Sequence, residues 1–248
     1  MASYFPRRRL SSTTSNTSSS SCDSTSSPPT APLARDIQRI QQKFKSLSPS
    51  AAPHPWRVVS PRPLPNSWWV TPLLVACEYP WSPKSANKPK LDELLRVGVR
   101  TFIDLTEDGE LLPYEDILCK RAVLLGIDPA TIEYHRFPIR DRSLPKSLDF
   151  MDRVFLTLRQ NEQRGRVSAI HCRGGIGRTG LVVGCWLVER GIAKSGEEAL
   201  GIIASEWKSV EKCKRYPHSP ETGPQFDFVY NFKPIATTHK LQTVTCVA

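Results

Sequence analysis

The residues with the clearest chemistry lie together at positions 167–180, which read VSAIHCRGGIGRTG. A short apolar run ends at His171 and Cys172, glycines follow at 174, 175, 177 and 180, and a longer apolar run comes next. This order predicts a strand, a glycine-rich loop and the start of a buried helix. Glycine tolerates the positive φ angles that turn backbone N–H groups inward, and a helix N-terminus adds partial positive charge. We therefore predict an anion site, most naturally for phosphate.

Two side chains make this loop reactive. Cys172 stands at its rim, and Arg178 follows six residues later, at the start of the predicted helix. A thiol near a helix N-terminus and a guanidinium ionises more readily than a free cysteine, which favours the nucleophilic thiolate. The planar side chain of Arg178 can donate two hydrogen bonds to two phosphate oxygens. With the hydroxyl of Thr179 beside them, these residues predict covalent transfer of a phosphate group.

Residues 171–180 resemble the H-C-x5-R-[ST]-G signature of the cysteine-based protein tyrosine and dual-specificity phosphatases. The resemblance covers residues 60–232 and implies phosphomonoester hydrolysis through a phosphocysteine intermediate, without a metal or cofactor. It implies that Cys172 is the nucleophile, that His171 orients it and that Thr179 helps to expel the thiolate. The residues implied to hold the phosphate oxygens are Arg173, Gly174, Gly175, Ile176, Gly177 and Arg178.

A general acid is expected upstream of the signature. Residues 132–139 read as a strand and residues 144–160 as a helix, so Asp141 lies on a loop just beyond a strand end, 31 residues before Cys172. Catalytic groups of open α/β sheets gather outside the carboxyl ends of strands, and a carboxylic acid can protonate a departing oxygen. The resemblance places the family's general acid on such a loop, which makes Asp141 the candidate. It also implies that Gln225 is the glutamine that positions the hydrolytic water.

Other interpretations of the loop are possible. Gly175, Gly177 and Gly180 match a dinucleotide-binding fingerprint, but the acids about 20 residues on, Glu197 and Glu198, lie in a predicted helix rather than after a strand. A Walker loop is excluded because Leu181 stands where lysine is required, and the chain has no C-x2-C pair for zinc. A buried, inert cysteine and a phosphate-binding scaffold without turnover stay open as alternatives.

Two charged segments also have two interpretations each. Residues 106–110 read TEDGE and form either a solvated turn or a wall in which an acid braces Arg178. Residues 212–220 read KCKRYPHSP and form either a solvated linker or a surface that meets an acidic substrate. We prefer a phosphoprotein substrate, at tyrosine or serine/threonine, because Ile176 replaces a second basic residue in the loop; phosphoinositides and other small phosphoesters are the alternative.

Composition narrows the class of protein. The seven cysteines do not show the spacing of a disulfide framework, which indicates a reducing compartment. The sequence contains no run of 18 apolar residues, so no transmembrane segment is predicted. We expect a cytoplasmic protein; a nuclear location stays open, as does organelle targeting by the Arg- and Ser-bearing first 22 residues. The net charge of +10 is concentrated in residues 1–60, which hold eight Lys/Arg and two Asp/Glu, so a nucleic-acid partner is not expected. The oligomeric state is left open.

The predicted organisation is one domain between two tails. Residues 1–55 are Ser/Thr/Pro-rich and predicted to be disordered, with a possible amphipathic helix at 33–47. Residues 56–233 form the phosphatase domain and residues 234–248 a C-terminal tail. Strands and helices alternate through the domain, which predicts a three-layer α/β fold with a mostly parallel central sheet flanked by helices. The further predicted strands are residues 56–59, 67–70, 73–76 and 99–105, and the further helices residues 91–97, 113–125 and 195–207.

Overall fold

The computed structural model describes residue 42 and residues 61–85, 87 and 89–235. The predicted tail at 1–55, its helix at 33–47, the strand at 56–59 and most of the C-terminal tail therefore lie outside the described residues. The described part contains a five-stranded sheet in the order β1-β2-β5-β3-β4. Strand β1 runs antiparallel to β2, and all other neighbours are parallel. The strands are β1 Ser67–Thr71, β2 Leu74–Cys77, β3 Val99–Asp104, β4 Glu133–Arg136 and β5 Val167–His171.

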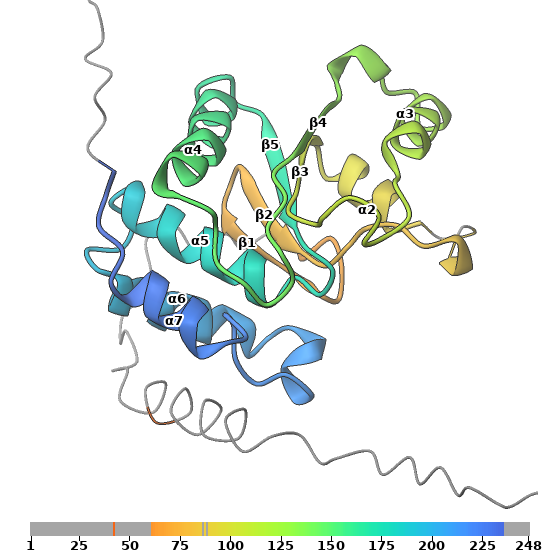
Figure 1. The fold of residues 1–248 in the computed structure, drawn as a ribbon. Helices are drawn as coiled ribbons and strands as arrows, with labels where there is room; N and C mark the ends of the chain where they lie inside the picture. The colour runs from red at the N-terminus through yellow and green to blue at the C-terminus, as the bar shows by residue number, and fades with distance from the viewer. Residues whose placement is uncertain (1–41, 43–60, 86, 88, 236–248) are drawn as a thin grey trace, which may run out of the picture.

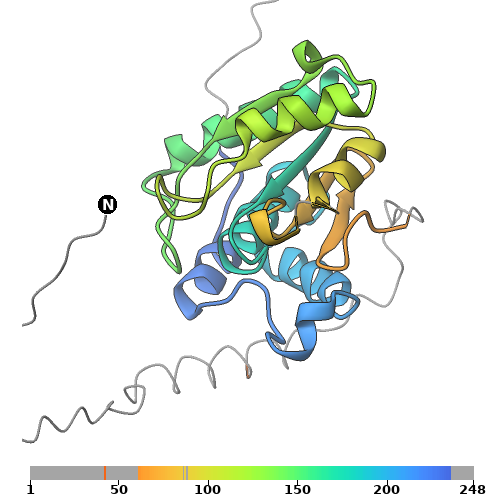
Figure 2. The same ribbon diagram turned by 90° about the vertical axis from the view of Figure 1, so that its right-hand side faces the viewer.

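Helices cover both faces of this sheet, which confirms the predicted three-layer α/β fold (Figures 1 and 2). One face carries α4 and α5, with α6 and α7 packed on α5, and the other face carries α2 and α3. The helices are α2 Lys90–Arg96, α3 Glu115–Leu124, α4 Leu148–Gln163, α5 Gly177–Glu189, α6 Gly196–Trp207 and α7 Gly223–Tyr230. Short 3-10 turns are η1 Pro83–Ser85, η2 Pro129–Thr131 and η3 Glu211–Lys214.

Side-chain alternation along the strands builds the two cores. In β3, Ile103 packs with the α4 and α5 side while Phe102 packs with the α2 and α3 side. Ile170 and Ala169 divide in the same way in β5. Such two-sided burial is expected for the inner strands of a parallel sheet. Helix α5 is buried along nearly its whole length, so the loop before it is anchored in the centre of the molecule.

The boundaries of two predicted elements near Asp141 were wrong. The helix predicted at 144–160 begins only at Leu148, because Ser147 is its N-cap and its Oγ accepts a hydrogen bond of 3.1 Å from Phe150 N. The strand predicted at 132–139 is limited to Glu133–Arg136. Residues 137–147 are thus a longer connection than expected, and this connection carries Asp141.

Candidate active site

The loop between β5 and α5 turns tightly around a glycine. Gly175 has a φ of +72°, and a Cβ placed there would lie 2.6 Å from the carbonyl oxygen of Cys77. A side chain at this position would therefore clash with the backbone of β2, in addition to the strain of a left-handed conformation. Glycine is therefore required at position 175, both by the turn and by the close approach of strand β2.

The carbonyl groups of this loop are held by donors from outside it. Arg173 O accepts from Tyr79 N at 3.2 Å, Gly174 O from Lys212 Nζ at 3.1 Å and Ile176 O from Ser219 Oγ at 2.8 Å. In a trans peptide the carbonyl and the next N–H point in opposite directions. The following N–H groups therefore point away from these donors, as a cradle of amide donors for an anion requires.

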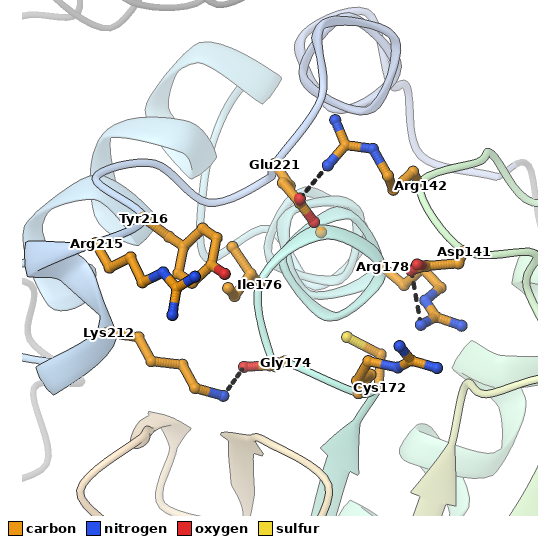
Figure 3. A pocket seen from close by; sticks show the side chains of 12 residues that line it. Asp141, Arg142, Cys172, Gly174, Ile176, Arg178, Lys212, Arg215, Tyr216 and Glu221 are labelled. Atoms are coloured by element: carbon orange, nitrogen blue, oxygen red, sulfur yellow. Dashed lines mark hydrogen bonds and ion pairs between the residues drawn. The ribbon is translucent and has the colours of Figure 1, made fainter. Parts of the chain in front are cut away.

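A cavity of about 410 Å³ opens over the loop, and Cys172 lies at its base beside Arg178 (Figure 3). Its walls come from four segments: the loop itself, the connection after β4, the segment from η3 onward and the turn before α7. The lining residues are Asp141, Arg142, Cys172, Arg173, Gly174, Ile176, Gly177, Arg178, Lys212, Arg215, Tyr216 and Glu221. Gly175 is not among them, because it faces β2.

Arg178 is held by a carboxylate from a distant loop. Its Nη1 and Nη2 atoms each donate to one oxygen of Glu110, both at 2.7 Å, and Nη1 also donates to Ile139 O at 3.0 Å. Burial opposes the charges of both partners, but their hydrogen bonds prevail: they raise the pKa of Arg178 and lower the pKa of Glu110. Of the two interpretations of residues 106–110, the structure shows the wall that braces Arg178.

Asp141 lies beside Arg178 in the wall of the cavity (Figure 3). Its Oδ1 lies 2.9 Å from Arg178 Nη2, and its side chain is 52% exposed whereas that of Arg178 is 1% exposed (Figure 3). The three residues of the proposed chemistry, Cys172, Arg178 and Asp141, therefore line one cavity. In this arrangement the carboxylate of Asp141 already occupies part of the anion-binding surface of Arg178.

His171 lies behind the loop and is fully buried. Its Nε2 shares a hydrogen bond of 2.6 Å with the hydroxyl of Tyr114, and its Nδ1 is 3.8 Å from Asp104 Oδ1. Burial is the main cause that lowers the pKa of His171, and the charge of Arg178 acts in the same direction. A neutral imidazole fixed in this way can support Cys172 through the backbone but cannot reach the cavity as an acid.

Thr179 and Gln225 do not line the cavity. The hydroxyl of Thr179 is buried and has no hydrogen-bond partner among the described residues. Gln225 is fully buried, and both ends of its amide are bonded: Oε1 accepts from Thr222 N at 3.2 Å, and Nε2 donates to Ser143 O at 3.1 Å. The roles that the resemblance implies for these two residues stay predictions.

The structure adds residues that the sequence did not single out. Lys212, Arg215 and Tyr216 form one wall of the cavity (Figure 3), so the basic segment at 212–220 is not only a linker. Lys212 and Lys90 both pair with Glu78, and although burial opposes the charge of Glu78, these lysines lower its pKa. Only the basic composition of this segment could have indicated its place, because its partners lie far away in the sequence.

Comparison with known proteins assigns the family. The model of the Swiss Army Knife protein, DSP-PTPase phosphatase domain, matches residues 65–222. The chain belongs to this family of phosphatase domains, and the predicted membership of the tyrosine and dual-specificity phosphatase superfamily is confirmed.

Among the described residues, no helix has the length and apolar character needed to cross a membrane, and no group of three or more His, Cys, Asp or Glu side chains is arranged to hold a metal.

The chain is also similar to a curated protein, of which it spans less than a fifth, and to solved structures. Protein tyrosine phosphatase domain-containing protein 1 of Mus musculus is 30% identical over 129 residues, which is 49% of this chain but 17% of the mouse protein. The crystal structure of Tk-PTP in the active form is 25% identical, with a TM-score of 0.49, over 66% of this chain and 94% of that one. Kinase associated phosphatase, with its catalytic cysteine substituted by serine, is 22% identical, with a TM-score of 0.46, over 63% of this chain and 83% of that one.

Proposed function

We propose that this domain hydrolyses phosphomonoesters through a phosphocysteine intermediate and that its substrates are phosphoproteins. The observation that carries the proposal is the cavity in which Cys172, Arg178 and Asp141 converge over a loop with its carbonyl groups held outward. A nucleophile, a fixed cation and a proton donor are the three groups that phosphate transfer from an ester requires.

In the first step, the Cys172 thiolate attacks phosphorus in line with the bond to the leaving oxygen. The S–P bond forms, the P–O bond breaks and protonated Asp141 gives its proton to the departing oxygen. Before this step the phosphate dianion replaces the Asp141 carboxylate on Nη2 of Arg178, and the displaced carboxylate takes up a proton from solvent, while Glu110 keeps the guanidinium in place. Substrate entry thereby frees Asp141 for the leaving group.

In the second step, water attacks the phosphocysteine. Asp141, now ionised, accepts a proton from this water as the O–P bond forms and the S–P bond breaks. Inorganic phosphate leaves, and Cys172 returns to the thiolate. The charge of the transferred group is balanced throughout by Arg178 and the loop N–H groups, so the reaction needs no metal or cofactor.

The walls of the cavity support a phosphoprotein as the substrate. Ile176 contributes an apolar surface within the loop, and Tyr216 adds an aromatic ring to the wall opposite Asp141. Glu78, which also pairs with Lys90, offsets part of the charge of Lys212, and this leaves less basic surface for the further phosphates of an inositol headgroup. Phosphotyrosine and phosphoserine or phosphothreonine peptides are both expected to enter; a phosphoinositide is the alternative substrate.

The first experiment measures turnover of an aryl phosphate by wild type, Cys172→Ser and Asp141→Asn, with a chelator present. We expect no turnover by Cys172→Ser, because a hydroxyl is far less ionised than a thiol at neutral pH. We expect Asp141→Asn to lose about 10²- to 10⁴-fold, with larger losses for more basic leaving groups. Substantial activity in Cys172→Ser would refute the nucleophile, and wild type that binds phosphate without turnover would identify a binding scaffold.

The substrate class is tested with the same wild-type protein. Initial rates on a phosphotyrosine peptide, a phosphoserine peptide and a phosphoinositide in mixed micelles are compared at equal concentration. Higher kcat/KM on the peptides supports the proposal. A preference for the phosphoinositide would overturn the substrate assignment while leaving the chemistry of Cys172 intact.

A further inference from the structure

The loop that carries Asp141 is attached to the rest of the domain at few points. Residues 140–143 are largely exposed, and Arg142 has a φ of +57°. Among the described residues, this loop is bonded outward through three contacts: Asp141 to Arg178, Arg142 to Glu221 and the carbonyl of Ser143 to Gln225. The ion pair between Arg142 and Glu221 lies at one edge of the cavity (Figure 3).

One of these contacts is lost in the proposed reaction. When a phosphate dianion takes the place of Asp141 on Arg178, the contacts of Arg142 and Ser143 are those that the loop keeps among the described residues. These two contacts must then hold the carboxyl group within hydrogen-bond reach of the leaving oxygen, because proton transfer requires heavy-atom distances of about 2.6–3.2 Å.

Gln225 is the more rigid of the two remaining anchors. Its side chain is fully buried, whereas Arg142 and Glu221 are partly exposed and salt bridges of that kind contribute little. Its Oε1 belongs to the capping box with Thr222 that starts α7. A Cβ placed on Gly177 would lie 2.8 Å from Oε1, so the amide also packs against the first residue of α5. Gln225 thus connects the phosphate-binding helix to the Asp141 loop.

We propose that Gln225 is a positioning residue that holds Asp141 for protonation of the leaving group. This inference rests on the proposed function and gives Gln225 a different step from the resemblance, which implies that a glutamine orients the hydrolytic water. A residue that orients water affects breakdown of the phosphocysteine. A residue that positions the acid affects formation of the phosphocysteine, and its effect grows with the basicity of the leaving group.

Gln225→Glu tests this role with little change in shape. Glutamate keeps the oxygen that accepts from Thr222 N, but loses the N–H that donates to Ser143 O. We expect kcat/KM to fall about tenfold or more on phenyl phosphate, which is part of the contribution of a general acid. On dinitrophenyl phosphate, whose leaving group needs no proton, we expect a much smaller loss. Gln225→Met, which removes the donor without adding charge, is expected to show the same dependence on the leaving group.

Thr222→Ala is the matched control. It removes the hydroxyl that accepts from Gln225 N and caps α7, but leaves the bond from Gln225 to Ser143. We expect a lower Tm than wild type with an unchanged ratio of kcat/KM between the two aryl phosphates. If Thr222→Ala changes this ratio as strongly as Gln225→Glu does, the effect is one of α7 stability and the proposal is overturned.

Two further measurements separate the possible failures. In the Asp141→Asn background, Gln225→Glu should cause no additional loss on phenyl phosphate, because the group that it positions is absent. Burst kinetics on dinitrophenyl phosphate report breakdown of the intermediate: a larger burst in Gln225→Glu, with kcat/KM unchanged on both esters, would assign Gln225 to water and overturn our inference. If Asp141→Asn itself shows no dependence on the leaving group, the general acid of the proposed function has failed instead.

Discussion

The two halves of the cavity are built in different ways. The phosphate half, formed by residues 172–178, is enclosed: Cys172 and Arg178 are almost fully buried, and Glu110 fixes the guanidinium through two hydrogen bonds. The acid half, formed by residues 140–143, lies at the surface, and about half of the Asp141 side chain is exposed. One half is fixed by backbone geometry and a buried ion pair, the other by side-chain contacts at its edges.

The proposed function accounts for this difference between the two halves. Charge that develops on a transferring phosphoryl group is stabilised best by donors that do not reorganise during the reaction. A proton donor, by contrast, must approach a leaving group that arrives with the substrate and departs with the product. In the proposed reaction Asp141 and phosphate compete for Nη2 of Arg178, so the acid half has to change its contacts in every turnover.

Arg178→Lys should separate the two halves most clearly. Lysine keeps the charge but cannot donate a fork of hydrogen bonds to phosphate, nor bond both oxygens of Glu110. We expect kcat/KM to fall about 10²- to 10³-fold, the range for loss of a preorganised donor. Because the acid is unchanged, the loss should be similar for phenyl and dinitrophenyl phosphate. A loss confined to the more basic leaving group would show that the halves do not act independently.

Glu110→Gln should lower kcat/KM on both aryl phosphates, as Arg178→Lys does, but by a smaller factor. The amide keeps one acceptor for Arg178 but loses the charge and the second oxygen, so the guanidinium is less firmly held. We expect kcat/KM to fall about tenfold, near the worth of one hydrogen bond to a charged group. Steady-state rates on both aryl phosphates measure it. Asp108→Asn, at an exposed carboxylate of the same loop that pairs with Arg136, is the matched control and should leave the rates unchanged.

The phosphate half could be predicted from the sequence because it is contiguous. The end of β5, the loop and the start of α5 follow one another in residues 167–180, and each local preference agrees with the others. The apolar run, the glycines and the buried helix therefore defined the position of Cys172 and Arg178 without knowledge of the rest of the fold. The alternation of strands and helices was sufficient for the three-layer class.

The supports of this loop could not be predicted in the same way. Glu110 lies 68 residues from Arg178 and Gln225 lies 82 residues from Ser143, so no local pattern records either contact. The acidic composition of residues 106–110 allowed a brace, but a solvated turn has the same composition. The position of Asp141 was predicted correctly as a loop after a strand, although the strand ends three residues earlier than expected. Tertiary packing decides these features.

The smallest predicted effect concerns the pH dependence of stability. Glu78 is buried beneath the phosphate loop, where Lys212 and Lys90 lower its pKa against the effect of burial. Because the pKa in the folded state lies below the ordinary value of 4.5, the unfolded chain binds more protons in acid. The stabilisation by Glu78 is therefore present at neutral pH and is lost as the pH falls through the lowered pKa.

Glu78→Gln should consequently be less stable than wild type at neutral pH, and this difference should shrink in acid. Urea unfolding of both proteins, at neutral pH and at a series of values below 4.5, measures the difference in free energy. Glu93→Gln is the control, since Glu93 pairs with Arg96 at an exposed position where an ion pair contributes little. A Glu78→Gln difference that stays constant with pH would mean that packing rather than charge supports this side of the phosphate loop.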